Sequence, residues 1–378
     1  MKILHVCSDY SKQKIYQKFI SALSDFTDSQ IVYVPVRSEE ELNRNPVSSS
    51  NVKIYYSNIL RKFHRVLFRS KIRRVFKDLN EKIDVGSVDL IHAHFLYSDG
   101  AVALKAYKKY GIPYVVAVRN TDINMFMKFR PDLKLLAIDI LRKASAVVVL
   151  TPSYKQILID FSPSSERVRL SKKVLVLPNG VDEYWLKNIN ISKSTKENTI
   201  RILYVGDLSA NKNINSVLQA IDMLSSDLNI EYTVVGSGGG KGERQFLNVV
   251  SKNKYSFLHY VGRVDNKEKL LPIYRCNDIF VMPSFKETFG VSYIEALSQG
   301  LPIIFSKGQA VDGYFDHTNV GVAVDPRDVN DIAYKIKLVC QDLEARKLGC
   351  TAEAERFSWG PVVHKYVDVY NRIRNKTD

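Results

Sequence analysis

Short apolar runs rich in β-branched residues alternate with amphipathic stretches of helical period along the chain. The runs predict strands at residues 30–35, 89–93, 114–119, 146–151 and 174–178 in the first half, and at 200–205, 231–235, 256–261, 278–282 and 302–305 in the second. Strands separated by helices are typical of parallel sheets, because a parallel pair needs a long crossover connection. The pattern therefore predicts an α/β protein with doubly wound parallel sheets.

This layout occurs twice, which predicts two domains. MKILHVCSDY at the start and IRILYVGDLS near residue 200 are each a short apolar strand followed by small residues and a helix. The polar stretch KNINISKSTKEN at 187–198 is typical of a linker, and a length of 378 residues suits about two domains. We expect Rossmann-like domains over 1–186 and 187–358, followed by a C-terminal helix at 359–378.

Two such halves raise the possibility of a dinucleotide-dependent dehydrogenase. The richest glycine loop, GSGGGKG at 236–242, does not give G-x-G-x-x-G from either start, because the sixth position is Lys241 or Glu243. The first loop, at 1–11, has no glycine. The dehydrogenase interpretation is therefore disfavoured, and the loop at 236–242 either brings backbone N–H groups to a nucleotide diphosphate or is a flexible turn.

The segment at 278–305, DIFVMPSFKETFGVSYIEALSQGLPIIF, carries the most specific chemistry. A strand ends before Pro283, and a helical pattern ends at Gly300 with a proline soon after. Glu287 therefore lies in the loop before the helix, and Glu295 lies on the helix. A helix N-terminus suits a phosphate, and carboxylates suit sugar and ribose hydroxyls. The segment predicts a nucleotide-sugar site, although glutamates eight apart are also common as solvated surface charges.

The string P-S-x-x-E-T-F-G-x-x-x-x-E-A-L-x-x-G-x-P in this segment resembles the E-x7-E signature of glycosyltransferase family 4, retaining sugar transferases of the GT-B fold. PNGVD at 178–182 is similar to the segment that closes the family's first domain. The resemblance implies two Rossmann-like domains that face each other across a cleft, with the C-terminal helix packed back on the first. It implies a UDP- or GDP-linked sugar donor and no cofactor. It also implies that Glu287 is catalytic and that Thr288, Phe289, Gly290 and Glu295 bind the donor.

More donor-site residues follow from the same resemblance. GDLSANKN at 206–213 resembles the family's G-R-L-x-x-x-K-G segment and places Lys212 against the donor diphosphate, where its charge would stabilise the leaving group. Asp207 departs from the pattern, because the family commonly has arginine there. The further donor-binding residues that we expect are Gly206, Asp207 and Gly236 around the diphosphate and Arg263 at the base.

The acceptor side is predicted from the first half. IHAHF at 91–95 resembles the family's H-x-H segment at the end of a strand that faces the cleft, which implies that His94 is catalytic and positions the acceptor, with His92 beside it. Two histidines on one face of a strand also suit a metal. Nearby spacing indicates no third ligand, and no D-x-D pair stands in the donor motifs, so we expect no metal.

Arg119 and Asn120 end the next predicted strand, where many relatives carry a histidine. We expect both residues to bind the acceptor. An arginine there suggests an acceptor that bears phosphate or carboxylate, unless the guanidinium forms a buried salt bridge with Asp122 or another acid.

Composition adds a cellular setting. The four cysteines show no C-x-x-C spacing, which predicts neither a disulfide framework nor a zinc site and favours a reducing compartment. No apolar run approaches the ~18–20 residues that span a bilayer, and the first residues do not have the pattern of a signal peptide. We expect a cytoplasmic protein.

Charge is uneven along the chain. Residues 1–190 hold 31 Lys and Arg against 18 Asp and Glu, whereas the rest holds 24 against 22. The excess peaks at 53–77, where nine basic residues meet no acid and apolar residues recur, largely at helical spacing. This basic amphipathic stretch predicts peripheral binding to an anionic membrane. A packed helix with a solvated basic face is the alternative, and the absence of any nucleic-acid motif disfavours nucleic-acid binding.

Together these features predict a retaining glycosyltransferase, peripherally attached to a membrane. We expect it to extend a lipid-linked glycan in the assembly of a surface polysaccharide such as O-antigen, capsule or exopolysaccharide. The departure at Asp207 leaves open a nucleotide-binding GT-B protein without transferase activity.

Overall fold

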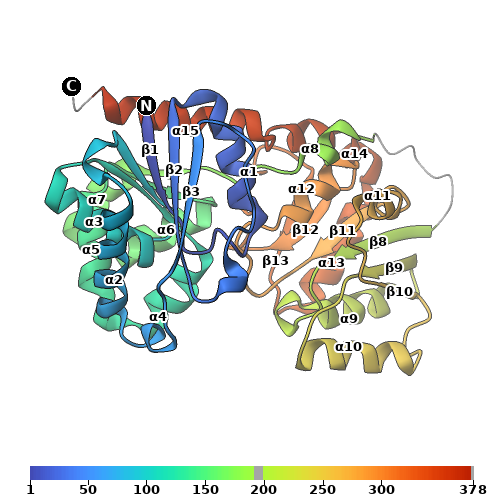
Figure 1. Ribbon diagram of the computed structural model, residues 1–378. Helices are drawn as coiled ribbons and strands as arrows, with labels where there is room; N and C mark the ends of the chain where they lie inside the picture. Colours follow the sequence, from blue (N-terminus) through green and yellow to red (C-terminus); the bar gives the residue numbers. More distant parts are fainter. Residues whose placement is uncertain (191–198, 376–378) are drawn as a thin grey trace. The chain divides into compact units, whose positions relative to one another are not determined.

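The computed structural model describes residues 1–190 and 199–375, and the chain divides into two compact units (Figure 1). Unit 1 contains residues 1–150 and 154–179 and the segment that begins at Trp359. Unit 2 contains Thr151–Ser153 and Gly180–Ser358. Each unit has one parallel sheet, which confirms the predicted α/β fold.

The sheet of unit 1 has seven strands in the order β3-β2-β1-β4-β5-β6-β7, and every pair is parallel. Its central strands are buried along their whole length, because helices cover both faces and each side chain must enter one of two cores. The strands are β1 (Lys2–Val6), β2 (Ser29–Val36), β3 (Val52–Asn58), β4 (Leu90–Ala93), β5 (Tyr114–Val118), β6 (Ala146–Val149) and β7 (Val174–Val176).

Two hydrophobic cores lie on the two faces of this sheet, and alternate residues of one strand enter different cores. In β5, Val115 and Ala117 face one core, and Val116 and Val118 face the other. The first core is closed by α1 (Lys14–Leu23) and α15 (Trp359–Arg374). The second is closed by α2 (Phe68–Lys82), α3 (Ser98–Tyr110), α5 (Lys134–Lys143), α6 (Pro152–Phe161) and α7 (Ser164–Lys173), with the short α4 (Met127–Phe129) nearby.

The sheet of unit 2 has six strands in the order β10-β9-β8-β11-β12-β13, again with parallel pairs. Helix α9 packs on α13, and α12 packs on α14. The strands are β8 (Thr199–Val205), β9 (Asn229–Val235), β10 (Leu258–Gly262), β11 (Ile279–Met282), β12 (Ile303–Ser306) and β13 (Gly321–Val324). The helices are α8 (Glu183–Lys187), α9 (Ile214–Leu224), α10 (Lys241–Ser251), α11 (Lys267–Arg275), α12 (Val291–Ser298), α13 (Val329–Gln341) and α14 (Leu343–Glu355).

Each predicted strand is present, but β3 and β13 were not predicted. The helical interpretation of 53–77 is wrong for its first part, because the residues up to Asn58 form β3 and the helix begins only at Phe68. The β-branched and aromatic residues of VKIYYSN favour a strand, and they pair with β2 along their length. Most of the predicted linker at 187–198 lies outside the described residues.

Candidate functional site

Two neighbouring strands of unit 2 bring the predicted catalytic pair together. In parallel α/β sheets, ligands bind beyond the carboxyl ends of the strands. Adjacent strands β8 and β11 end at Val205 and Met282, and the segments that follow them carry Lys212 and Glu287. The Lys212 ammonium forms an ion pair with the Glu287 carboxylate, and the two side chains are only 18% and 14% exposed. Although Glu287 lies in a loop, its side chain is thus largely buried.

Hydrogen bonds hold the loop before α12 in place around this ion pair. The Phe285 N–H donates to the Asn211 carbonyl at 2.8 Å, and the Asn211 side chain donates to the Lys286 carbonyl at 2.7 Å. The Thr288 N–H donates to Glu287 Oε1 at 3.0 Å. The carboxylate is therefore oriented before a ligand arrives, which is the arrangement that favours electrostatic catalysis.

Helix α12 begins with N–H groups that no side chain caps. Gly290 precedes it with φ 74°, and a Cβ there would lie 2.5 Å from the Tyr293 ring, so only glycine fits this start. The uncapped N–H groups and the helix dipole suit an anion such as a diphosphate.

Glu295 lies on α12 in a half-buried position. The Tyr274 hydroxyl donates a hydrogen bond to its carboxylate at 3.1 Å. Burial raises the pKa of Glu295 from 4.5 to about 7. A carboxyl of this kind accepts hydrogen bonds from ribose hydroxyls best once it is ionised.

The glycines at 206 and 236–242 have a packing role. Gly236 has φ 144°, and a Cβ on it would lie 1.8 Å from the Gly206 carbonyl oxygen. A Cβ on Gly238 would lie 2.3 Å from an Asp207 side-chain oxygen, and one on Gly242 would lie 2.2 Å from the Ala210 nitrogen. These glycines let the loop after β9 pack on the loop after β8. That accounts for much of the glycine content without a ligand.

Three predicted donor residues lie in other surroundings. Phe289 is buried in an aromatic cluster with Tyr314 and Phe357. Arg263 is exposed, and its Nε donates to Asp265 at 2.8 Å. Asp207 is exposed, and its carbonyl accepts a hydrogen bond from the Tyr204 hydroxyl at 2.6 Å. Donor contacts by these three residues remain predictions.

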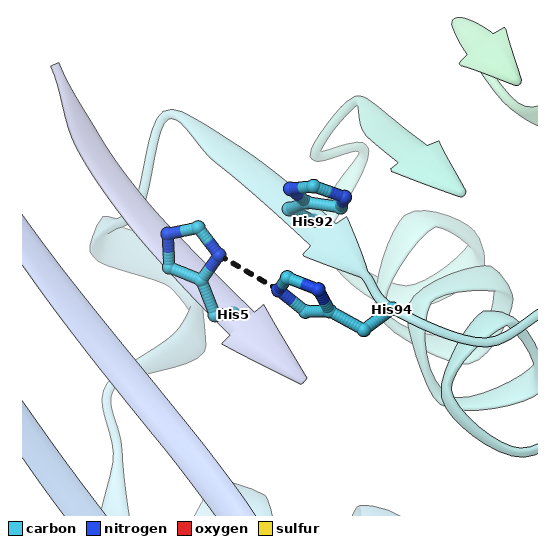
Figure 2. A group of neighbouring side chains, drawn as sticks. All are labelled: His5, His92 and His94. Carbon is cyan, nitrogen blue, oxygen red and sulfur yellow. Dashed lines mark hydrogen bonds between the residues drawn. The ribbon is translucent and has the colours of Figure 1, made fainter. Parts of the chain in front are cut away.

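In unit 1, both predicted histidines point into the interior. His92 and His94 are 0% and 1% exposed, and their rings stack at 4.2 Å between centroids. His5 of β1 lies beside them, with its Nδ1 3.1 Å from Nε2 of His94 (Figure 2). Burial lowers the pKa of His5 to about 3 and the pKa of the other two well below 6.5, so all three are neutral. A cleft-facing role for His94 remains a prediction that this burial does not favour.

Arg119 directly follows β5 and is buried, and its guanidinium has no carboxylate partner among residues 1–190 and 199–375. Its Nε donates to the His94 carbonyl at 3.4 Å. Asp122 accepts instead from backbone N–H groups, those of Leu96 at 3.0 Å, Tyr97 at 3.2 Å and Arg119 itself at 2.9 Å. The expected alternative, a salt bridge from the guanidinium to Asp122, is not formed. Asn120 is hydrogen-bonded by the Asn124 side chain.

Two α/β units, each with a parallel sheet and one of them with an E-x7-E motif, are the architecture of a GT-B glycosyltransferase. The model of Glycosyltransferase Family 4 matches residues 29–184, and that of Glycosyl transferases group 1 matches residues 187–352. The chain therefore belongs to glycosyltransferase family 4, the retaining group 1 glycosyl transferases of the GT-B fold. This makes it a transferase rather than only a nucleotide-binding protein.

Two curated relatives and one solved structure illustrate the likeness. An uncharacterized glycosyltransferase of Methanocaldococcus jannaschii is 25% identical over 308 residues, 76% of each chain. The O-antigen chain mannosyltransferase B of Escherichia coli is 30% identical over 176 residues, 45% of each chain. The Anabaena protein HepE, solved in complex with UDP and glucose, matches with a TM-score of 0.68 at 16% identity over 98% of this chain and 99% of that one.

Sequence reasoning missed His5, Tyr274 and Tyr370 as partners of the predicted residues. His5 is aligned with His92 by the pairing of β1 and β4, and the Tyr370 hydroxyl of α15 lies 2.7 Å from His92 Nδ1. Each contact joins residues distant in the chain, so no local spacing could have indicated it.

Proposed function

We propose that this glycosyltransferase moves a sugar from a UDP- or GDP-linked donor to a lipid-linked glycan at an anionic membrane surface, in the assembly of a surface polysaccharide. The observation that carries the donor part is the Lys212–Glu287 ion pair, because Glu287 lies in the loop that leads into the uncapped N-terminus of α12. The relationship to an O-antigen chain mannosyltransferase supports the polysaccharide part.

The proposed chemistry places the donor diphosphate at the N-terminus of α12. Breaking the anomeric C–O bond leaves charge on the departing phosphate oxygen, which the Lys212 ammonium and the helix N–H groups stabilise. In the front-face retaining mechanism, that oxygen also takes the proton from the attacking acceptor hydroxyl. No enzyme nucleophile is then needed, and the residues act by orientation and charge. Glu287 holds Lys212 in position, and Glu295 accepts hydrogen bonds from ribose.

Arg119 supports an acceptor that bears a negative group. A buried guanidinium without a carboxylate partner is costly unless an anion joins it, and Arg119 stands at the carboxyl end of a central strand, where ligands of such sheets bind. The diphosphate or sugar acid of a lipid-linked glycan would supply that anion. We propose Asn120 as a neighbouring polar contact.

One face of unit 1 suits a membrane. The exposed basic residues around the start of α2 make no ion pair with the described residues, in particular Arg61, Arg65, Arg69 and Arg73. Beside them are apolar side chains with large exposed areas, among them Val66 at 75% and Leu135 at 82%. A groove of about 400 Å³ runs between α2, α3 and α5. Its lining includes the apolar Phe68 and Leu135 and the charged Arg69, Arg73, Lys105, Lys108, Asp132 and Asp139. We call these four arginines, Val66, Leu135 and the groove the basic–apolar face.

Such a face fits the surface of a bilayer, with the apolar side chains at the acyl boundary and the arginines at anionic head groups. No helix in the described ranges is both long enough and apolar enough to span the bilayer. Attachment would therefore be peripheral.

The test is a nucleotide panel followed by a transfer assay. Purified protein is melted with UDP, GDP, ADP and their sugar conjugates. One nucleotide and its conjugates are expected to raise the melting midpoint, by an amount that grows with the logarithm of ligand concentration over its dissociation constant. The stabilising sugar nucleotide is then supplied with a lipid-linked acceptor and with a soluble analogue that lacks lipid and phosphate. Transfer to neither acceptor from any stabilising donor would contradict the proposal.

A further inference from the structure

Three histidines that no step of the proposed reaction uses meet in the core of unit 1. His5 comes from β1, His92 comes from β4, and His94 directly follows the last residue of β4 (Figure 2). One ring nitrogen from each lies within 4.8 Å of the corresponding atoms of the other two. Phe19 packs edge-on against all three rings, and α1 and α15 close the core around them.

The hydrogen bonding of this cluster is incomplete. His92 Nε2 and His94 Nδ1 are buried and have no hydrogen-bond partner in the described part of the chain. A neutral imidazole has one donor and one acceptor nitrogen, and buried groups of this kind are nearly always paired. The unpaired nitrogen of His92, whose other ring nitrogen lies against the Tyr370 hydroxyl, points to a bound species in this cluster.

We propose that His5, His92 and His94 bind one transition-metal ion of the class that prefers imidazole, with Zn²⁺ as the representative. Zn–N bonds of about 2.0–2.1 Å in tetrahedral geometry separate neighbouring ligand nitrogens by about 3.4 Å. The distance of 3.1 Å between His5 Nδ1 and His94 Nε2 is already close to this separation of ligand nitrogens. Without the ion, a proton on His94 Nε2 makes the hydrogen bond to His5 Nδ1. When the ion binds both of these nitrogens, His94 carries its proton on Nδ1 instead, so the imidazole stays neutral and no proton is released.

Groups behind the ligands fit such a site. Metal-bound histidines usually donate their other N–H to a nearby acceptor, which fixes the ring. The Tyr370 oxygen lies 2.7 Å from His92 Nδ1 and can accept that proton. The Gln30 carboxamide is hydrogen-bonded with His5, and its oxygen can accept the proton of His5 Nε2. Three neutral ligands leave the ion its full charge, and the nearby Arg119 guanidinium opposes that charge, so we expect weaker binding than at a site with anionic ligands.

Through Tyr370, the ion would connect β1 and β4 to α15, the helix that returns from the far end of the chain. The site has no exposed ligand, so the ion has to bind while the chain folds or when α15 opens. Its effect is expected on the stability of unit 1, separate from donor binding in unit 2.

The test measures metal content directly and does not depend on activity. Full-length protein is produced in medium with added Co²⁺, exchanged into metal-free buffer and analysed by elemental analysis and visible absorption. About one Co²⁺ per chain is expected, with the intense visible bands of a four- or five-coordinate site. His5→Gln and His92→Gln should lose the ion, and His364→Gln, a substitution of an exposed histidine of α15, should retain it.

A further variant keeps the test decisive if a histidine variant fails to fold. Tyr370→Phe keeps all three ligands and removes only the oxygen behind His92, and it should weaken Co²⁺ binding by about tenfold. Absence of stoichiometric Co²⁺ from the wild type would overturn the proposal and leave a hydrogen-bonded imidazole cluster. Unchanged Co²⁺ in folded His5→Gln and His92→Gln, or unchanged affinity in Tyr370→Phe, would overturn it as well.

Discussion

The two units have the same plan of parallel strands and crossover helices, but their polar side chains lie at different depths. In unit 2, Lys212 and Glu287 form a pair in the segments that follow the strands, within reach of a ligand. In unit 1, His92 and His94 are on the strand and at its end, and they are enclosed by aromatic side chains. The two motifs thus lead to a partly exposed ion pair in one unit and to a buried cluster in the other.

This difference separates what substitutions should do. Changes in unit 2 should act on turnover and donor binding, and changes in unit 1 should act on the acceptor, the membrane or stability. Four experiments would sharpen or break that division, in order of decreasing expected effect.

The largest effect is expected at the ion pair of unit 2. Glu287→Ala and Lys212→Ala should each lower kcat by about 10³-fold, because the negative charge on the departing phosphate, which this pair stabilises, grows in the transition state. The double variant should be little worse than either single one, since the two side chains act as a unit. Steady-state kinetics with donor and acceptor varied separately measure this, and Lys286→Ala, at an exposed neighbouring position, is the control. Wild-type turnover in Glu287→Ala would remove this pair from the mechanism.

The next largest effect is expected on the basic–apolar face. Replacing Arg61, Arg65, Arg69 and Arg73 with Gln should lower binding to anionic vesicles by about a hundredfold or more, because each basic residue near such a surface contributes roughly 1 kcal/mol. Binding by the wild type should weaken as salt rises. Sedimentation with vesicles at low and high salt measures both.

A charge-matched control for this variant comes from unit 2, where exposed Lys241, Arg244, Lys252 and Lys254 are replaced with Gln. That control should bind vesicles like the wild type, and both variants should bind donor normally. Equal loss in the two variants would show that only total charge matters and that no particular face docks.

Arg119 should show a smaller and more selective effect. Arg119→Ala is expected to raise KM for a phosphate-bearing acceptor by about 10- to 100-fold, because an anion loses its buried partner. An acceptor analogue without the charged group should be used equally by the variant and the wild type, and Arg119→Lys should recover part of the loss. If KM rises equally for both acceptors, Arg119 has a structural role only.

The smallest effect concerns the pH dependence of Glu295. Its pKa in the folded state is raised by burial to about 7, so its contribution to stability is present at low pH and is lost as pH rises through about 7. Donor affinity should change in the opposite direction and rise a few-fold between pH 6 and 8 as the carboxylate forms. Glu295→Gln should flatten both profiles in thermal melts and donor titrations. A wild-type slope in the Gln variant would assign the titration to another group.

The fold and the segments that carry Glu287 and Lys212 could be predicted from the sequence because the needed signals are local. Strand, loop and helix follow one another within 278–305, and the family resemblance added Lys212 from a second local segment. The cluster of unit 1 depends on the pairing of His5 with His92, because β1 and β4 are neighbours in the sheet although they are far apart in the sequence. Register between distant strands is fixed by the packed sheet and cannot be read from spacing. Strand β3 was missed for a related reason, because its basic neighbours masked a pattern that pairing with β2 completes.

Helix α15 determines when unit 1 can complete its folding during synthesis. Its side chains complete the core of unit 1 against Phe19 and the histidines, yet they are encoded after the last residue of unit 2. Domains generally fold as units from the N-terminus while the chain emerges. Here unit 1 emerges first but cannot complete its folding before unit 2 has been synthesised. Its aromatic face stays uncovered until unit 2 has been made, so a chain that stops before Trp359 would present a ready surface to chaperones and proteases.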